Sequence, residues 1–249
     1  MITSTVNLKL NLRTQVQLFK GSDQWEAATV QKAFRARETA LLICDMWDQH
    51  WCKTSTQRFD TIAKRMGSVV NAARENGVQI IHSPSDCMAF YEETSQRERI
   101  QELPHVEPPQ LFQIDEPPLP IDASDEGCED TPPCKPYKAW TRQHAAIPIA
   151  EGDVISDNGS EIYNLFHAYG IQHLIIMGVA VNMCILGRSF GIRQMTRWGI
   201  ECVLVRDLTD AMYNPKMPPF VSHDRGTELV VQHIEQYWCP SILSENLVT

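Results

Sequence analysis

The sequence predicts an α/β protein with an open, mostly parallel, doubly wound sheet and helices on both faces. Apolar runs of strand length recur along the chain, and segments whose apolar residues follow helical spacing separate them. Runs such as "TALLICDMW" and "IQHLIIMGVA" are largely apolar without alternation, which is typical of parallel strands buried on both faces. In such sheets ligands bind outside the carboxyl ends of the strands, so the residues that end each apolar run are the candidates for function.

The first elements follow from these patterns in chain order. Alternating apolar and polar residues over 1–21 predict a β-hairpin or paired strands, and we assign 1–37 to an N-terminal β extension. The buried strand "LLICDM" comes next, followed by a helix over 54–77 that Gly77 ends. "VQIIHSPSD" predicts the second buried strand, which ends in polar residues.

A long irregular segment then interrupts the pattern. Residues 103–140 are rich in Pro, Asp and Glu without periodicity, which predicts a lid-like insertion. After it, "AIPI" predicts a short strand and "GSEIYNLFHAYG" a helix with Ser160 in the capping position. Strand and helix then alternate through "IQHLIIMGVA", "NMCILGRSFGIRQMTRWG", "IECVLVRDLTD" and "TELVVQHIEQYW". We expect these elements to form a single domain over 1–249.

Composition limits the class of function. The formal net charge is −9 and no long Lys/Arg run occurs, so we expect a small-molecule partner and neither nucleic acid nor membrane. No stretch approaches the roughly 18 continuous apolar residues of a membrane span, and the N-terminus lacks the apolar core of a signal peptide. These features predict a soluble, cytoplasmic protein.

The cysteines fall into two groups. Eight occur at irregular spacing, and those inside apolar runs, such as Cys44 and Cys202, are predicted to be reduced core thiols. Cys128 and Cys134 lie instead in the Pro-rich segment "GCEDTPPCKP", which leaves a disulfide or a metal clip open.

Cys184 is the candidate nucleophile. It follows a strand end by a few residues and is predicted in the first turn of a helix, where free N–H groups and the helix dipole favour a thiolate. Asp45 ends the strand "LLIC", so it is expected at the same sheet edge and could take the thiol proton. The alternative interpretations are a core cysteine and an Asp that caps a loop.

These residues resemble a known family. "LLICDMW" and "GVAVNMC", supported by "GSEI" and "VLVRDLTDAM", are similar to the isochorismatase-like cysteine hydrolases, which include nicotinamidases, over roughly residues 38–212. The resemblance implies the isochorismatase-like fold and hydrolysis of an amide C–N bond through a thioester on Cys184, with Asp45 transferring protons. It also implies a cis peptide bond between Val179 and Ala180, which would turn the Ala180 and Cys184 N–H groups toward the developing oxyanion.

The chain departs from the family at its third catalytic position. The family carries a Lys about eight residues before the Gly of the helix-start motif, and an ungapped count back from Gly159 reaches Glu151. We therefore place Glu151 in the catalytic set, within hydrogen-bonding reach of Cys184 or Asp45. Lys138 or Arg142 would occupy the position only in a shifted register.

An acid there changes the electrostatics of the site. Two carboxylates beside a thiol raise its pKa, so Cys184 needs a cation from elsewhere to become a nucleophile. His50, His82, Arg142 and a bound metal are the candidates for that cation.

Polar and aromatic residues at the first two strand ends are candidates for substrate binding. Asp48, His50 and His82 offer polar groups there, and Trp47 could form an aromatic wall for a planar substrate. Nicotinamidases carry an Asp/His/His zinc site, which leaves zinc open at Asp48, His50 and His82. The spacing of these residues does not reproduce that motif, so we expect no metal and no cofactor.

The resulting function prediction is a cysteine-dependent hydrolase of a small amide or ureido compound, related to nicotinamidases. A non-catalytic or altered-function member that binds a small ligand is the alternative, because Glu151 replaces the family Lys. An isochorismatase-type hydrolase of a vinyl ether is a weaker alternative, since those enzymes lack the cysteine. The resemblance also implies a homo-oligomer.

Overall fold

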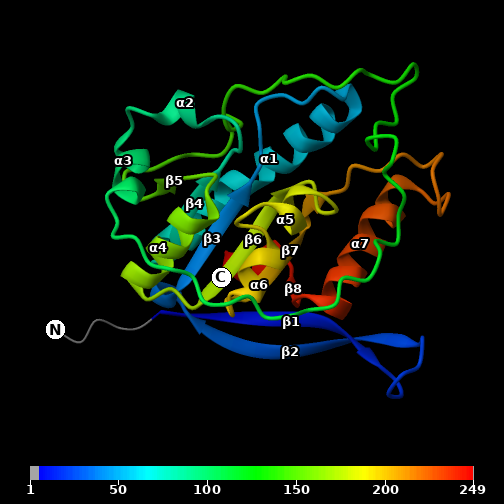
Figure 1. The fold of residues 1–249 in the computed structure, drawn as a ribbon, viewed down its shortest axis with the longest axis horizontal. Helices are drawn as coiled ribbons and strands as arrows, with labels where there is room; N and C mark the ends of the chain where they lie inside the picture. Colours follow the sequence, from blue (N-terminus) through cyan, green and yellow to red (C-terminus); the bar gives the residue numbers. More distant parts are fainter. Residues whose placement is uncertain (1–5, 249) are drawn as a thin grey trace.

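A computed structural model describes residues 6–248, which form an eight-stranded sheet with the order β2-β1-β8-β7-β6-β3-β4-β5 (Figure 1). No helix within these residues has the length and hydropathy to cross a membrane. The strands are β1 (Asn7–Gln17), β2 (Trp25–Arg35), β3 (Thr39–Cys44), β4 (Gln79–Ser83), β5 (Val154–Ile155), β6 (His173–Val179), β7 (Glu201–Asp210) and β8 (Ser241–Ile242). The α-helices are α1 (Lys53–Glu75), α2 (Met88–Tyr91), α3 (Ser95–Gln101), α4 (Gly159–Tyr169), α5 (Cys184–Gly187), α6 (Ile192–Arg197) and α7 (His223–Tyr237), and 3-10 turns lie at η1 (Ala36–Glu38) and η2 (Ser244–Leu247).

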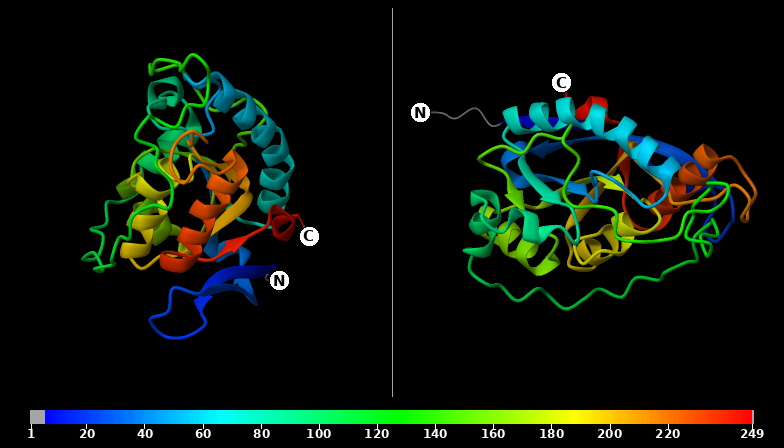
Figure 2. Two further views of the ribbon diagram at one scale, coloured as in Figure 1. Left: turned by 90° about the vertical axis from the view of Figure 1, so that its right-hand side faces the viewer. Right: turned by 90° about the horizontal axis from the view of Figure 1, so that it is seen from above.

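The sheet is doubly wound, as predicted. Strands β3 to β8 pair in parallel, and helices cover both faces: α1 and η2 lie on one, α4 to α7 on the other (Figure 2). Side chains alternate along a strand, so Leu41 and Ile43 pack in the α1 core while Leu42 and Cys44 pack in the core of the opposite face. All four are fully buried, which explains why "LLIC" has no polar alternation.

The N-terminal β extension is confirmed for its described part. Strands β1 and β2 form an antiparallel hairpin, and β1 pairs antiparallel with β8 at the edge of the parallel sheet. Leu8, Leu10 and Leu12 alternate with exposed residues and are buried in the α1 core, which fixes the register of the hairpin. Residues 1–5 of this predicted extension lie outside the described residues.

Three predicted elements need correction. "AIPI" forms no strand; the strand is β5, which pairs with β4 a few residues later. Helix α4 is capped by Asn158 rather than Ser160, because the Asn158 side chain accepts hydrogen bonds from the Ser160 and Glu161 N–H groups. The helix predicted after the Cys184 motif is two short helices, α5 and α6, with Gly191 between them. A side chain at Gly191 would meet backbone atoms of Ile185 and Arg188, so the chain turns tightly at this point.

The segment 103–140, called the strap below, contains no helix or strand. Figure 1 shows it running from α3 past α4, α6 and α7 and returning across the start of α1. The Val106 N–H donates to Asn164 in α4 at 2.9 Å, and the Phe112 N–H donates to the Arg197 carbonyl in α6 at 3.0 Å. The segment predicted as a lid therefore wraps along the helices, and only its end reaches the sheet edge described next.

Candidate active site

Asp45 and Cys184 come together because their strands are neighbours. β3 and β6 pair in parallel with Cys44 opposite Gly178, so the residues that follow both strands share one edge of the sheet. Gly178 has φ of 122°, and a Cβ on it would lie 2.0 Å from the Cys44 carbonyl oxygen. Only glycine allows this close approach of β3 and β6. Asp45 is fully buried, and its carboxylate and the Cys184 thiol lie close enough for each to shift the pKa of the other.

Arg188 supplies the cation that the sequence prediction had sought elsewhere. Its Nε donates to Asp45 Oδ2 at 2.9 Å, while the Ser85 N–H donates to Asp45 Oδ1 at 2.8 Å. Arg188 follows Cys184 by four residues, a spacing that puts both on one face of a helical turn. That spacing was the sequence signal that could have identified Arg188. Asp45, Cys184 and Arg188 are called the Cys184 cluster below.

The electrostatics of the cluster keep the thiol neutral at rest. Burial raises the pKa of Cys184, the negative charge of Asp45 raises it further, and Arg188 lowers it, leaving it at about 12. Burial also raises the pKa of Asp45, opposed first by Arg188 and then by hydrogen bonds from Cys184 and Ser85. The expectation of an acidic thiol at a helix start is therefore wrong: α5 is a single turn, and desolvation outweighs its dipole.

The backbone before Cys184 offers N–H groups to the site. The peptide bond between Val179 and Ala180 is cis, as the family resemblance implies. The Ala180 backbone N–H lies near the Cys184 sulfur and lowers the pKa of the thiol. Within residues 6–248, neither the Ala180 N–H nor the Cys184 N–H donates to a backbone carbonyl. Both remain available to an oxygen placed next to the sulfur.

An aromatic wall belongs to the same part of the core as Cys184. Cys184 and Trp140 both pack against a small buried cluster that includes Trp47 and Tyr91. The rings of Trp47 and Trp140 stack with centroids 4.2 Å apart and an interplanar angle of 13°. Trp47 Nε1 donates to the Ser85 carbonyl at 3.0 Å, whereas the buried Trp140 Nε1 has no partner among the described residues. Trp140 was missed in the sequence because it lies in the strap, which has no pattern that marks a site.

His82 does not face the site, contrary to its assignment as a substrate-binding residue. It is fully buried, and its ring nitrogens contact Gln143 Oε1 at 2.9 Å and Asp153 Oδ2 at 3.0 Å. Asp153 also pairs with Arg74 at 2.7 Å. Burial opposes ionisation of Asp153, but the hydrogen bonds from His82, Arg74 and the Ala150 N–H outweigh it and lower its pKa to about 2. This network fastens the start of β5 to α1.

Asp48 and His50 lie near the wall but have structural partners. The Asp48 carboxylate accepts hydrogen bonds from the N–H and hydroxyl of Thr141, at 2.9 and 2.6 Å. The His50 ring accepts from the Cys52 N–H at 3.2 Å and lies parallel to Trp140, 6.0 Å away. Burial lowers the pKa of His50 to about 4, so it is neutral and cannot act as the missing cation.

Glu151 is not in the site, so its assignment as a catalytic residue is wrong. Its side chain is exposed, and within the described chain it makes no hydrogen bond to Asp45 or Cys184. The cause is the misplaced strand: Glu151 precedes β5, at the amino end, rather than following it at the carboxyl end. The alternatives also lie elsewhere, since Lys138 donates to the Asp86 carbonyl, and the Arg142 guanidinium lies 3.9 Å from Asp48 and over the Phe90 ring.

A zinc site of the nicotinamidase type does not fit this chain. The donor atoms of Asp48, His50 and His82 do not gather, and both ring nitrogens of His82 already have partners. Among residues 6–248, the one group of His, Cys, Asp and Glu side chains whose donor atoms all lie within 4.8 Å of one another is Cys52, Cys128 and Asp130.

No protein-family model and no curated protein matches the chain. Solved structures do match it, and they provide an independent comparison of the fold. A cysteine hydrolase from Pseudomonas syringae pv. phaseolicola superposes with a TM-score of 0.56 at 14% identity, over 86% of this chain and 92% of that one. An isochorismatase from Pseudomonas putida gives 0.51 at 12% identity, over 85% and 91%. The chain has the isochorismatase-like fold.

An isochorismatase-like hydrolase from Alkaliphilus metalliredigens agrees, with a TM-score of 0.50 at 10% identity over 86% of this chain and 96% of that one. At such identities the likeness concerns the isochorismatase-like fold alone. Any activity has to be argued from the Cys184 cluster itself.

Proposed function

We propose that this protein is a cysteine-dependent hydrolase of a small amide or ureido C–N bond. One observation carries the proposal: the buried Asp45 carboxylate lies beside the Cys184 thiol, close enough for each group to shift the pKa of the other, and Arg188 holds the other side of the carboxylate. A nucleophile, its base and a group that orients the base are the parts that covalent catalysis needs. A structural cysteine needs none of them.

The first half of the reaction forms a thioester. Asp45 accepts the thiol proton as the Cys184 sulfur attacks the substrate carbonyl carbon, and the carbonyl π electrons move onto oxygen. The Ala180 and Cys184 N–H groups donate to that oxyanion, a contribution worth about 10²–10³ in rate for each donor. Asp45 then gives its proton to the leaving nitrogen as the C–N bond breaks, which releases ammonia or an amine.

The second half restores the thiol. Water attacks the thioester carbonyl while Asp45 takes its proton, and the C–S bond breaks to give the carboxylic or carbamic acid. The proton on Asp45 returns to the Cys184 sulfur. The balance is one amide and one water to one acid and one amine. Arg188 contributes by position and charge, because its contact with Asp45 favours the ionised carboxylate that can accept the first proton.

The aromatic wall indicates the class of substrate. The stacked rings of Trp47 and Trp140 offer an apolar face to a planar group, and an amide or ureido group is planar. The Trp140 Nε1–H is buried without a partner in the described part of the chain, so a substrate oxygen can accept its hydrogen bond. A small, uncharged amide or ureido compound fits both features.

A panel of small primary amides and ureido compounds, assayed for ammonia release, tests the proposal. We expect wild type to hydrolyse at least one, and Cys184→Ala to lose more than about 10³-fold in kcat/KM on it. Cys202→Ala, which removes a buried thiol from β7, serves as the matched control and keeps its activity.

Three outcomes would contradict the proposal. Equal release by wild type and Cys184→Ala means that the nucleophile is assigned wrongly. Saturable binding of a panel compound without release favours the ligand-binding alternative. Cleavage of a vinyl ether that survives in Cys184→Ala favours the isochorismatase-type alternative.

A further inference from the structure

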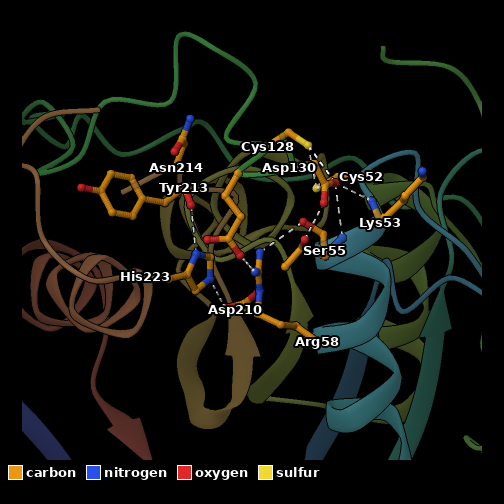
Figure 3. A network of polar contacts seen from close by, with 12 residues as sticks. Cys52, Lys53, Ser55, Arg58, Cys128, Asp130, Asp210, Tyr213, Asn214 and His223 are labelled. Atoms are coloured by element: carbon orange, nitrogen blue, oxygen red, sulfur yellow. Dashed lines mark hydrogen bonds and ion pairs between the residues drawn. The ribbon is translucent and has the colours of Figure 1, made fainter. Parts of the chain in front are cut away.

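A second cluster of polar side chains, which contains several thiols, lies at the start of α1 (Figure 3). Cys52 directly precedes α1, and the other three members, Cys128, Asp130 and Cys134, belong to the strap. Asp130 Oδ2 is the centre: the sulfurs of Cys52 and Cys128 each lie 3.3 Å from it, and the sulfur of Cys134 lies 3.2 Å from it. These four residues are called the Cys52 cluster, and none of them contributes to the reaction proposed above.

Hydrogen bonding alone does not account for this arrangement. Besides the three thiols, the Lys53 and Thr54 N–H groups donate to Asp130 Oδ2, at 2.9 and 3.4 Å. Five donors therefore converge on one carboxylate oxygen, which has only about two acceptor sites. The sulfurs of Cys52 and Cys128 are also only 2.8 Å apart, longer than a disulfide at about 2.05 Å. A bound cation that replaces the thiol protons, which leave to solvent, would relieve the crowding.

We propose that Cys52, Cys128 and Asp130 bind a thiophilic divalent cation, with Cys134 as the fourth ligand. Zn²⁺ fits best, because it takes four S, N or O ligands in a tetrahedron, whereas Mg²⁺ and Ca²⁺ prefer oxygen. Bonds of about 2.3 Å to sulfur and 2.0 Å to oxygen make the tetrahedron edges roughly 3.5–3.8 Å. The sulfur-to-Oδ2 distances of 3.2–3.3 Å are close to this, and the Cys52 and Cys128 sulfurs need to separate by about 1 Å. The Cys134 sulfur lies more than 4.8 Å from at least one of those two sulfurs and has to move toward them to complete the tetrahedron.

The surroundings of the cluster suit thiolate ligands. Cys52 and Cys128 are buried, while Cys134 is partly exposed and lines an open hollow of about 600 Å³ that gives an ion access from solvent. The N-terminus of the 23-residue helix α1 favours the negative charge that the cysteines acquire when they release their protons to bind the metal.

The consequence is a metal clip between the strap and α1. Cys128 and Cys134 are far from Cys52 in sequence, so a bound ion closes a long loop. The strap continues to Trp140 in the aromatic wall. Binding of the ion is therefore expected to stabilise the course of the strap as well as the start of the helix.

Metal analysis tests the clip without any assay of activity. The protein is purified reduced and without chelator, then analysed by elemental mass spectrometry, and after metal removal it is titrated with Co²⁺. We expect one Zn²⁺ per chain and, with Co²⁺, the near-ultraviolet sulfur-to-cobalt absorption of thiolate ligands. Cys128→Ala should lose the metal, Cys134→Ser should bind it more than about tenfold more weakly, and the control Cys202→Ala should retain it.

Two wild-type measurements keep the test independent of whether a variant folds. Chelation should lower the Tm of wild type, and denatured intact mass should show all eight cysteines reduced. Folded, reduced wild type that takes up neither Zn²⁺ nor Co²⁺ would overturn the proposal. So would an intact mass lower by two hydrogens with Cys52 linked to Cys128, because the pair would then form a disulfide.

Discussion

Asp45→Asn is expected to lower kcat/KM for amide hydrolysis by about 10³–10⁴-fold. An amide side chain keeps the shape of Asp45 and its acceptor oxygen, but it cannot take a proton from Cys184. The thiol, whose pKa burial still raises, would then have no base at neutral pH. Steady-state kinetics on the substrate found in the panel measure the loss.

The pH profile of kcat/KM distinguishes the loss of Asp45 as a base from the loss of a structural contact. Because burial raises the pKa of Asp45, the acid limb of wild-type kcat/KM should lie above the usual carboxyl range, with activity falling as pH drops through it. That limb should be missing from the residual activity of Asp45→Asn. Asp60→Asn, at a partly exposed position of α1, is the matched control and should reproduce the wild-type profile. An Asp45→Asn enzyme with wild-type kcat/KM would show that Asp45 is not the base.

Arg188→Gln is expected to have the second largest effect. It removes the cation 2.9 Å from the buried Asp45 carboxylate, so the pKa of Asp45 should rise further and the acid limb should move to higher pH. At neutral pH we expect kcat/KM to fall by about 10²-fold or more. A buried carboxylate that has lost its ion-pair partner should also cost about 3–5 kcal/mol in the free energy of unfolding.

Arg188→Lys distinguishes an electrostatic role of Arg188 from a packing role. Arg188→Lys keeps the positive charge and should recover part of kcat/KM and most of the acid-limb position, whereas Arg188→Gln recovers neither. Arg197→Gln removes a guanidinium that pairs with Glu116 at the surface and should leave the profile unchanged. If the acid limb of Arg188→Gln lies at the wild-type pH, Arg188 does not lower the pKa of Asp45.

The fold was predictable because parallel strands buried on both faces have a distinctive composition. β3 and β6 are apolar over most of their length, β4 and β7 each contain a shorter apolar run, and α1 and α7 are long enough to show helical spacing. β5 and β8 have two residues each, and α2, α3, α5 and α6 have seven or fewer, which is too short for a period to show. Missing β5 by a few residues was enough to assign Glu151 to the wrong end of the sheet.

Only the site residues that directly follow a strand could be predicted from the sequence. Asp45 and Cys184 follow β3 and β6 directly, so the sheet topology alone brings them together. Arg188 depends on the conformation of one helical turn. Trp140 and the Cys52 cluster depend on the strap, whose course is set by single contacts such as Asp130 with Thr54 rather than by any repeating pattern.

The central claim is that Asp45 deprotonates Cys184 for attack, and the rate of thiol labelling by chloroacetamide tests it most directly. In wild type at neutral pH we expect rapid carbamidomethylation of Cys184, located by peptide mass, although its resting pKa is about 12. In Asp45→Asn the rate at Cys184 should fall by about 10²-fold or more, while the partly exposed Cys134 serves as an internal reference and reacts as before. Labelling of Cys184 that is as slow as that of the buried Cys202, or that is unchanged in Asp45→Asn, would contradict the claim.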